Sequence, residues 1–352
     1  MKFRIIGTPV RFLLIVLLSV VTFSSCRKEL CYNHFRQAEI NIEWEREWER
    51  DYGASVMTGW NDVAMGFGYD MLRPGIPEGV TMLSYNEGGT QPYMSFLSPD
   101  GNNVNLGGDE RESVQSLLFY NNDTEYIVIQ DVASLPFARA STTGRSRSSL
   151  GLIKELHPDE RTINPPDVLY GAFIGSVPDI GIHQSRPLAV KMQPLVYTYI
   201  VRYEFEYGAQ HVALARGALA GMAESVYLRD GSTSQQSATL LYDCEPASYG
   251  YVAIVHSFGT PGFPDEYYGQ QSQLRDAPRR YTLNLELKFK NGKTREMTFD
   301  VSSQLASQPR GGVITVGGIR VEDDENKFES GFDVNVDDWG EHEDIDLPIG
   351  GQ

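Results

Sequence analysis

Short stretches in which apolar and polar residues alternate recur along most of the chain after residue 35. The stretch Phe35–Trp44 reads FRQAEINIEW and places most of its apolar residues on one side, because successive side chains of a β-strand point to opposite faces. These residues are Phe35, Ala38, Ile40 and Ile42. Clusters of Gly, Pro, Asn and Asp separate the stretches, and short strands interrupted this often are typical of a β-sandwich. Four more strands are predicted in the first half: Thr81–Tyr85, Tyr93–Leu97, Ser113–Tyr120 and Tyr126–Gln130.

The second half continues the same pattern. Its longest alternating stretch, Leu195–Glu206 (LVYTYIVRYEFE), predicts one long strand. Residues Lys290–Lys293 separate two alternating stretches and predict a hairpin, because the Asn291–Gly292 pair accepts the positive φ of a type I′ turn. Further strands are predicted at Leu188–Lys191, Tyr249–Ser257, Arg280–Phe289, Glu296–Val301, Val313–Val321 and Phe332–Val336.

Two segments depart from this pattern. Ala138–Ser149 reads ARASTTGRSRSS, which is polar and basic without apolar periodicity, and it predicts an exposed loop. Val212–Val226 reads VALARGALAGMAESV and is crowded with alanine and glycine. That segment is either a short helix crossing the sandwich or a strand packed tightly against a neighbour, and the pattern does not decide between them.

A rigid junction stands near the middle of the chain. Asn164–Asp167 contains two consecutive prolines, each of which fixes its own φ and restrains the preceding residue. We therefore place a domain boundary there. The prediction is an N-terminal sandwich of residues 35–163 and a C-terminal sandwich of residues 164–352.

The first 25 residues have the layout of a signal peptide. A basic start precedes the apolar run Phe12–Val21, which is too short to span a hydrocarbon core of roughly 30 Å as a permanent helix. Cys26 follows small residues, and this arrangement resembles a bacterial lipobox; two or three acyl chains there would anchor the protein stably. A secretory signal with a chance cysteine is the alternative. We expect residues 1–25 to be removed and residues 26–34 to form a lipidated tether.

The residue after this cysteine is Arg27 and not the aspartate of the proteobacterial inner-membrane retention rule. We therefore expect a lipid-anchored protein of the outer membrane, with the periplasmic face and the cell surface both open.

The chain carries a formal net charge of -17. Nucleic-acid affinity comes mainly from Lys and Arg that displace counterions from phosphates. The charge therefore argues against a DNA or RNA partner.

The two remaining cysteines, Cys31 and Cys244, could pair in an oxidising compartment. The alternative, which we favour, is a free thiol near the membrane and a buried strand cysteine, because two distant segments must fold together before the pair can meet. No Cys/His spacing typical of a zinc site is present in the sequence.

Motifs for catalysis are absent from the sequence: it has no nucleophile elbow, P-loop, HExxH or dinucleotide fingerprint. We therefore expect a protein that is not an enzyme and needs no cofactor. The acidic region Asp333–Asp346 offers the oxygen ligands that Ca²⁺ prefers, but it lacks the EF-hand spacing. A solvated acidic strand region is the interpretation that we favour.

Several aromatic residues stand in or near loops rich in glycine and proline. Exposed aromatic side chains are common binding anchors and could stack on sugars, but they could equally fold over the edge of a core, which we favour. These residues are Trp60, Phe258, Phe263, Tyr267 and Tyr268.

Five stretches in this order resemble a family of Bacteroidales lipoproteins related to fimbrial anchor and accessory subunits, within a branch defined as a domain of unknown function. The resemblance implies two transthyretin-like β-sandwich domains in tandem on a lipid tether. It also implies that a strand from one subunit fills a groove in the next. The stretches are Cys26–Leu30, Leu117–Ile129 (LLFYNNDTEYIVI), Pro166–Ala172 (PDVLYGA), Gly217–Leu228 (GALAGMAESVYL) and Phe332–Ile349 (FDVNVDDWGEHEDIDLPI).

The leading hypothesis is a non-enzymatic anchor or accessory subunit of a fimbria-like surface assembly. Its fimbrial partners would be contacted by strand addition, in which backbone hydrogen bonds give affinity and alternating side chains give specificity. The alternative is a surface protein that binds glycans or host matrix through the loop aromatics. The residues expected to contact a partner are Phe332, Val334, Val336, Trp339, Ile345 and Leu347.

Overall fold

The computed structural model describes residues 37–45, 60–72, 74–86, 89–106, 114–147, 150–177, 187–264, 279–322 and 344–345. Strands dominate these residues, and their longest helix has six residues, so the predicted all-β fold is confirmed. The helical turns are α3 (Asp62–Met65), η2 (Tyr69–Leu72), η3 (Leu135–Phe137), α4 (Gly151–Leu156), η4 (Ala209–His211) and α6 (Ser302–Ala306).

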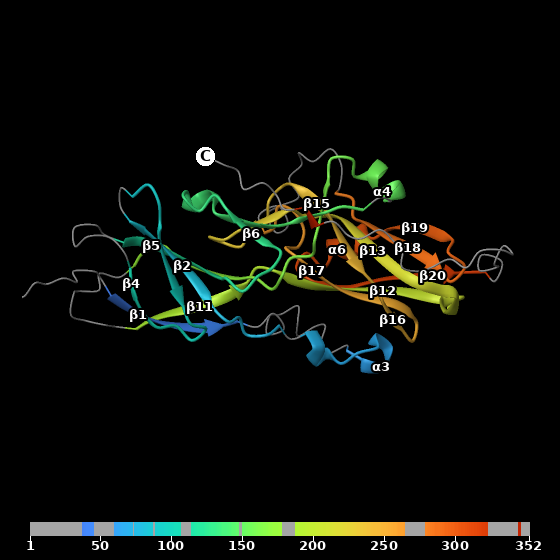
Figure 1. Ribbon diagram of the computed structural model, residues 1–352, viewed down its shortest axis with the longest axis horizontal. Helices are drawn as coiled ribbons and strands as arrows, with labels where there is room; N and C mark the ends of the chain where they lie inside the picture. The colour runs from blue at the N-terminus through green and yellow to red at the C-terminus, as the bar shows by residue number, and fades with distance from the viewer. Residues whose placement is uncertain are drawn as a thin grey trace, which may run out of the picture.

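One end of the elongated molecule is a seven-stranded sheet in the order β3-β2-β5-β10-β11-β1-β4 (Figure 1). The Ser95 hydroxyl on β3 donates to the Asn105 carbonyl on β4, so the sheet curls until its two edge strands meet. Ile40, Met82 and Phe119 fill the enclosed core, as the alternating sequence predicts. The strands are β1 (Gln37–Trp44), β2 (Val80–Asn86), β3 (Tyr93–Leu97), β4 (Asn103–Asn105), β5 (Val114–Asn121), β10 (Tyr170–Ile174) and β11 (Leu188–Pro194).

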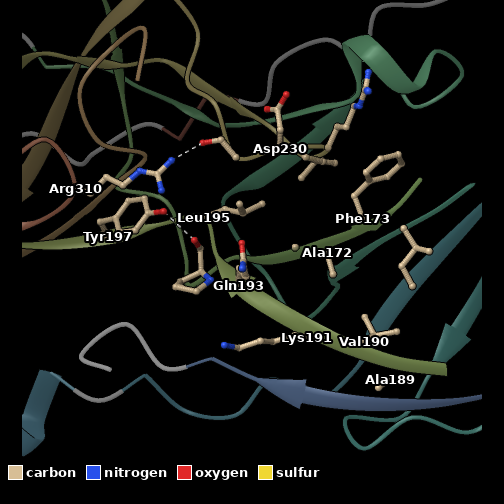
Figure 2. Close-up of a pocket in the computed structure, with 16 residues that line it drawn as sticks. Ala172, Phe173, Ala189, Val190, Lys191, Gln193, Leu195, Tyr197, Asp230 and Arg310 are labelled. Atoms are coloured by element: carbon tan, nitrogen blue, oxygen red, sulfur yellow. Dashed lines mark hydrogen bonds between the residues drawn. The ribbon is translucent and has the colours of Figure 1, made fainter. Parts of the chain in front are cut away.

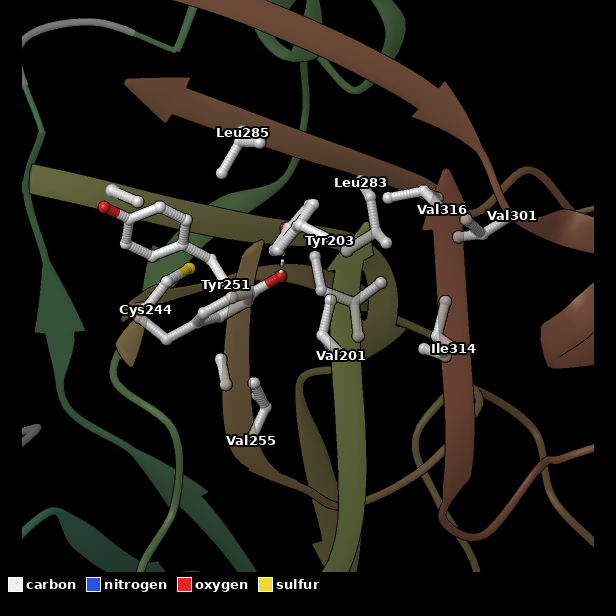
Figure 3. Packing of buried hydrophobic residues seen from close by; sticks show 14 of the residues in the cluster. Val201, Tyr203, Cys244, Tyr251, Val255, Leu283, Leu285, Val301, Ile314 and Val316 are labelled. Atoms are coloured by element: carbon white, nitrogen blue, oxygen red, sulfur yellow. Dashed lines mark hydrogen bonds between the residues drawn. The ribbon is translucent and has the colours of Figure 1, made fainter. Parts of the chain in front are cut away.

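The other end is a sandwich of two sheets. A four-stranded sheet, β16-β17-β12-β20, faces a seven-stranded sheet, β19-β18-β13-β15-β9-β8-β21. Figure 3 shows Val201 and Tyr251 of the first sheet packed towards Leu283 of the second. The strands are β8 (Gly144–Arg145), β9 (Arg161–Ile163), β12 (Tyr197–Tyr207), β13 (Val212–Ala223), β15 (Ser237–Asp243), β16 (Glu245–Ala247), β17 (Gly250–Ser257), β18 (Thr282–Phe289), β19 (Thr294–Asp300), β20 (Gly312–Arg320) and β21 (Asp344–Ile345).

A small third sheet joins the two ends. It contains β6 (Ile127–Gln130), β7 (Arg139–Thr142) and β14 (Ser225–Tyr227). Its side chains form a separate buried cluster with residues of both ends, including Leu118 from β5, Leu195 from the β11–β12 connection and Phe258 after β17. The two ends therefore share a hydrophobic contact.

The two segments that depart from the alternating pattern both form strands that pair with their neighbours. The polar segment Ala138–Ser149 is not a loop where the structure describes it, because it forms β7 and β8, and Ala140 is fully buried. That prediction was wrong because its small polar residues pair with flanking strands without showing an apolar alternation. The open question at Val212–Val226 is answered as strand: β13 lies between β15 and β18, and β14 follows it.

The predicted hairpin is confirmed, because β18 and β19 pair antiparallel around Asn291–Gly292. Its turn is not the predicted type I′, since Gly292 has φ 83° but Asn291 does not have the positive φ that this turn type also needs. The strands before Asn164 do not all belong to one end of the molecule, and the strands after it do not all belong to the other. β8 and β9 precede the junction and belong to the C-terminal sandwich, whereas β10 and β11 follow it and belong to the N-terminal sheet. The two ends are thus each built from segments on both sides of residue 164.

Candidate functional site

One edge of the C-terminal sandwich receives a strand from the acidic C-terminal region. β21 pairs antiparallel with β8, with Asp344 opposite Arg145 and Ile345 opposite Gly144. Ile345 is the only predicted partner-contacting residue within the described ranges. The other five, Phe332, Val334, Val336, Trp339 and Leu347, lie outside them, as does the predicted lipidation site Cys26.

Three arginines gather on the outer face of this sheet beside β8. The Arg145 and Arg216 guanidinium groups contact opposite oxygens of the Asp243 carboxylate, at 3.3 and 3.2 Å. Arg147 lies 2.7 Å from Glu286, and the Arg147 side chain is only 5% exposed. Burial lowers the pKa of Arg216, an effect that Asp243 opposes. The cluster thus contains three guanidinium groups and two carboxylates, and these five side chains together carry a net positive charge.

A groove of about 590 Å³ runs beside this cluster. One wall is α4 and the residue before it: Leu150 and Ile153 pack on Ala218 of β13, which holds the helix against the sheet. The other wall is the β8–β9 edge. Charged and polar side chains dominate the lining, with Arg145, Arg147, Lys154, Arg161, His157 and Glu160 as its ionisable members.

His157 and Glu160 form a hydrogen-bonded trio with Thr282 of β18. His157 Nδ1 lies 2.8 Å from Glu160 Oε1, and His157 Nε2 lies 2.9 Å from Thr282 Oγ1. This order of hydroxyl, imidazole and carboxylate is also that of hydrolytic triads. Thr282, however, is only 2% exposed and does not line the groove. The trio therefore ties the segment after α4 to the sheet.

Glu160 has further partners on two strands. Its Oε2 accepts hydrogen bonds from the Gly221 backbone at 3.0 Å and from the Thr239 hydroxyl at 2.8 Å. Burial raises the pKa of this carboxyl, but the hydrogen bonds from His157 and Gly221 outweigh burial, and its pKa is lowered.

A second cavity, of about 330 Å³, opens where β10 and β11 diverge (Figure 2). Among the residues that the structure describes, these two strands pair only at Tyr170–Pro194 and Gly171–Gln193. Arg310 reaches the rim, where it donates to the Gly231 carbonyl at 3.0 Å and lies over the Phe263 ring at 4.0 Å. The cavity is thus a polar slot with an arginine that is already held by the protein.

The remaining predicted residues fall into two groups. Phe258 and Phe263 are buried, as the favoured interpretation of the loop aromatics expects, and Trp60 packs edge-on against Phe67 and Tyr69. Tyr267 and Tyr268 lie outside the described residues.

Cys244 is a buried free cysteine in the core of the C-terminal sandwich, and burial raises the pKa of its thiol. Its proposed partner, Cys31, lies outside the described residues. Within the described ranges, no group of His, Cys, Asp or Glu side chains is arranged to hold a metal ion, and no helix is long and apolar enough to cross a membrane.

The arginine cluster was missed by sequence reasoning. Arg145 and Arg147 stand in the segment that the sequence predicts to be a loop, and their spacing of two residues is that of one strand face. Their carboxylate partners come from β15 and β18, about 100 residues or more away along the chain. The spacing was the only local signal of a shared face.

A family model described as "Domain of unknown function (DUF5119)" matches residues 61–243, which is more than half of the chain. A search of curated proteins finds no match to the chain.

Solved structures share the fold. A candidate adhesin from Bacteroides ovatus has 18% sequence identity and a TM-score of 0.54 over 85% of this chain and 96% of its own. The fimbrial anchor protein Mfa2 from Porphyromonas gingivalis has 9% identity and a TM-score of 0.38 over 80% of this chain and 91% of its own. At these identities the likeness to the Bacteroides protein shows the all-β architecture.

Proposed function

The chain belongs to the DUF5119 family, and from this premise we propose that it is a lipid-anchored cell-envelope protein that acts as a non-enzymatic anchor or accessory subunit of a fimbria-like assembly. The membrane anchor is Cys26, acylated after removal of residues 1–25. The partner is another subunit, contacted through the C-terminal segment Phe332–Ile349. The location is the outer membrane.

The observation that carries this proposal is the pairing of β21 with β8. β21 is the last strand of this sheet among the described residues, and the unpaired backbone groups of an edge strand can accept an added strand. The C-terminal region supplies a strand of that kind, and Phe332, Val334 and Val336 alternate as an added strand requires. Likeness in fold to a candidate adhesin supports an adhesive or assembly role.

The test replaces Phe332, Val334 and Val336 with aspartate in the full chain and measures co-purification of fimbrial subunits from the producing cells. We expect at least a tenfold loss, because alternate side chains of an added strand enter the partner's pockets. The matched control replaces Asp333 and Asn335 with serine, on the opposite side of the same predicted strand. Equal co-purification by both variants and the unaltered chain would refute strand addition.

The membrane anchor has its own test. In the same cells, Cys26→Ala should move the protein from the membrane fraction to the soluble fraction, because no lipid can then be attached. Mass spectrometry of the unaltered protein should show an acylated Cys26. A bare Cys26 thiol on the membrane-bound protein would contradict the anchor.

Glycan or matrix binding remains the second candidate. It now depends on Tyr267 and Tyr268, since Phe258 and Phe263 are buried and the half-buried Trp60 ring already packs against Phe67 and Tyr69. Binding on a glycan array that disappears when both tyrosines become alanine would favour it over the assembly role.

A further inference from the structure

The contact between β21 and β8 is too short to be held by backbone pairing alone. Each strand has two residues, and even a complete two-stranded hairpin is marginal in water. A second attraction must therefore act on the C-terminal segment, and the charges at this edge supply one.

The two sides of the contact carry opposite charge. On the sheet side, three guanidinium groups face two carboxylates, and Arg147 Nε is buried without a hydrogen-bond acceptor among the described residues. Lys154 adds an exposed positive charge from α4. On the segment side, Asp337–Asp346 reads DDWGEHEDID, in which six of ten residues are acidic. The register sets one of them, Asp344, opposite Arg145.

We propose that the groove between α4 and the β8–β9 edge is a docking site for an acidic, extended peptide segment, and that its occupant is the chain's own segment Asp337–Asp346. Two residues of this segment already pair with β8, which lines the groove, in the same molecule. The 21 residues between Glu322 and Asp344 extend to roughly 70 Å at most, which is the reach of the connection from the end of β20. This inference does not depend on the assembly role, because it needs no fimbrial subunit.

Charge attraction at a partly exposed site weakens with salt, because the screening length falls from about 10 Å at 0.1 M to about 3 Å at 1 M. Docking of the segment should therefore loosen as salt is raised. A strand held by backbone pairing and apolar packing would not respond in this way.

The test measures backbone hydrogen exchange by mass spectrometry on the full chain, without any partner, in peptides that cover Gly144–Arg147 and Asp337–Asp346. At 0.05 M salt both peptides should be protected, and at 1 M salt their exchange should become at least tenfold faster. Lys154→Glu with Arg161→Glu should produce the same loss at low salt. Unchanged protection in that variant and at high salt would overturn the proposal, as would no protection of Asp337–Asp346 at low salt.

The matched control reverses two lysines that do not line the groove, Lys290→Glu with Lys293→Glu, in the β18–β19 turn. Protection should stay within about twofold of the unaltered chain. Far-UV circular dichroism on every variant separates local release from unfolding: loss of protection with an unchanged spectrum supports docking. If the reversed pair at Lys154 and Arg161 unfolds the chain, neutralising Asp337, Asp338 and Glu343 tests the same contact from the other side, and unchanged protection there overturns it.

Cross-linking identifies the occupant. The test uses a Cys31→Ser background with Ser146→Cys and Glu343→Cys. If the antiparallel register of β8 and β21 continues by one residue, these two positions are directly opposite each other. Directly opposite residues of an antiparallel pair are about 5 Å apart, within reach of a disulfide. A disulfide within one chain supports the proposal. A disulfide only between two chains, or none, overturns the assignment of the chain's own segment as occupant.

Discussion

Single glycines decide how closely the strands of the C-terminal sandwich approach. Gly217 on β13 lies opposite Tyr242 on β15, and the Tyr242 side chain lies where a Cβ atom on Gly217 would be. The Tyr242 hydroxyl is hydrogen-bonded to that of Tyr203, which donates to the Asn284 carbonyl. The glycine therefore makes room for a buried tyrosine pair, and this explains part of the small-residue composition of β13.

Gly217→Ala should lower the free energy of unfolding by about 1–3 kcal/mol, because the added methyl group overlaps a ring that cannot move without breaking buried hydrogen bonds. Urea denaturation followed by tryptophan fluorescence measures the change. Gly75→Ala is the matched control, since nothing lies within 4 Å of a Cβ atom there, and it should change stability by less than about 0.5 kcal/mol. Equal effects of the two substitutions would contradict the role assigned to Gly217.

At the scale of elements, α4 and the segment after it act as a clamp on the outer face of the sandwich. Leu150 and Ile153 cover Ala218 and Ala220, and Glu160 holds three groups from different segments, including the Gly221 backbone. β13 is thus covered on both faces, which is why it has small residues instead of a clear alternation.

Glu160→Gln should destabilise the protein by about 1–3 kcal/mol at pH 7, because it removes a charged acceptor from buried donors. The folded-state pKa of Glu160 is lowered from an ordinary value of 4.5, so its contribution is complete above that value and is lost as the pH falls through the folded-state pKa. The stability difference between the two proteins should therefore shrink below about pH 4. Glu155→Gln, on the exposed side of α4, is the control in the same pH series. A difference that persists unchanged to pH 2 would count against this role.

At the scale of the whole molecule, the chain passes repeatedly between its two ends. α3 and η2 follow β1 yet lie beside the C-terminal sandwich, where the Met65 carbonyl accepts from the Tyr249 hydroxyl at 2.9 Å. The chain then returns for β2 to β5, passes to β8 and β9, and returns again for β10 and β11. These crossings, together with the shared cluster around Leu195, should make the two ends unfold together.

Calorimetry should accordingly show one transition. Leu195→Ala should lower the midpoint temperature and leave a single transition. The free energy of unfolding should fall by about 2–5 kcal/mol, as expected for truncation of a buried leucine. Leu152→Ala is the matched control because Leu152 is 47% exposed, and its midpoint should hardly move. Two transitions, of which Leu195→Ala shifts only one, would show that the ends unfold independently.

The sequence by itself determined where most strands lie, because the alternation of apolar and polar residues reports one buried face. β1, β2, β12 and the β18–β19 hairpin follow from it directly. It also pointed to the family, through stretches such as Leu117–Ile129 and Gly217–Leu228, which both lie within the matched region.

Only the tertiary structure decided what the sequence left open or had wrong. β13 is covered on both faces and therefore lacks an alternation of apolar and polar residues. β7 and β8 are strands because they pair with neighbouring strands, and their small polar residues show no alternation either. The membership of strands in sheets and the arginine cluster also depend on residues distant along the chain, such as Asp243 and Glu286. Local patterns report which face of a strand is buried, but the partner on the other side is set by the folded chain.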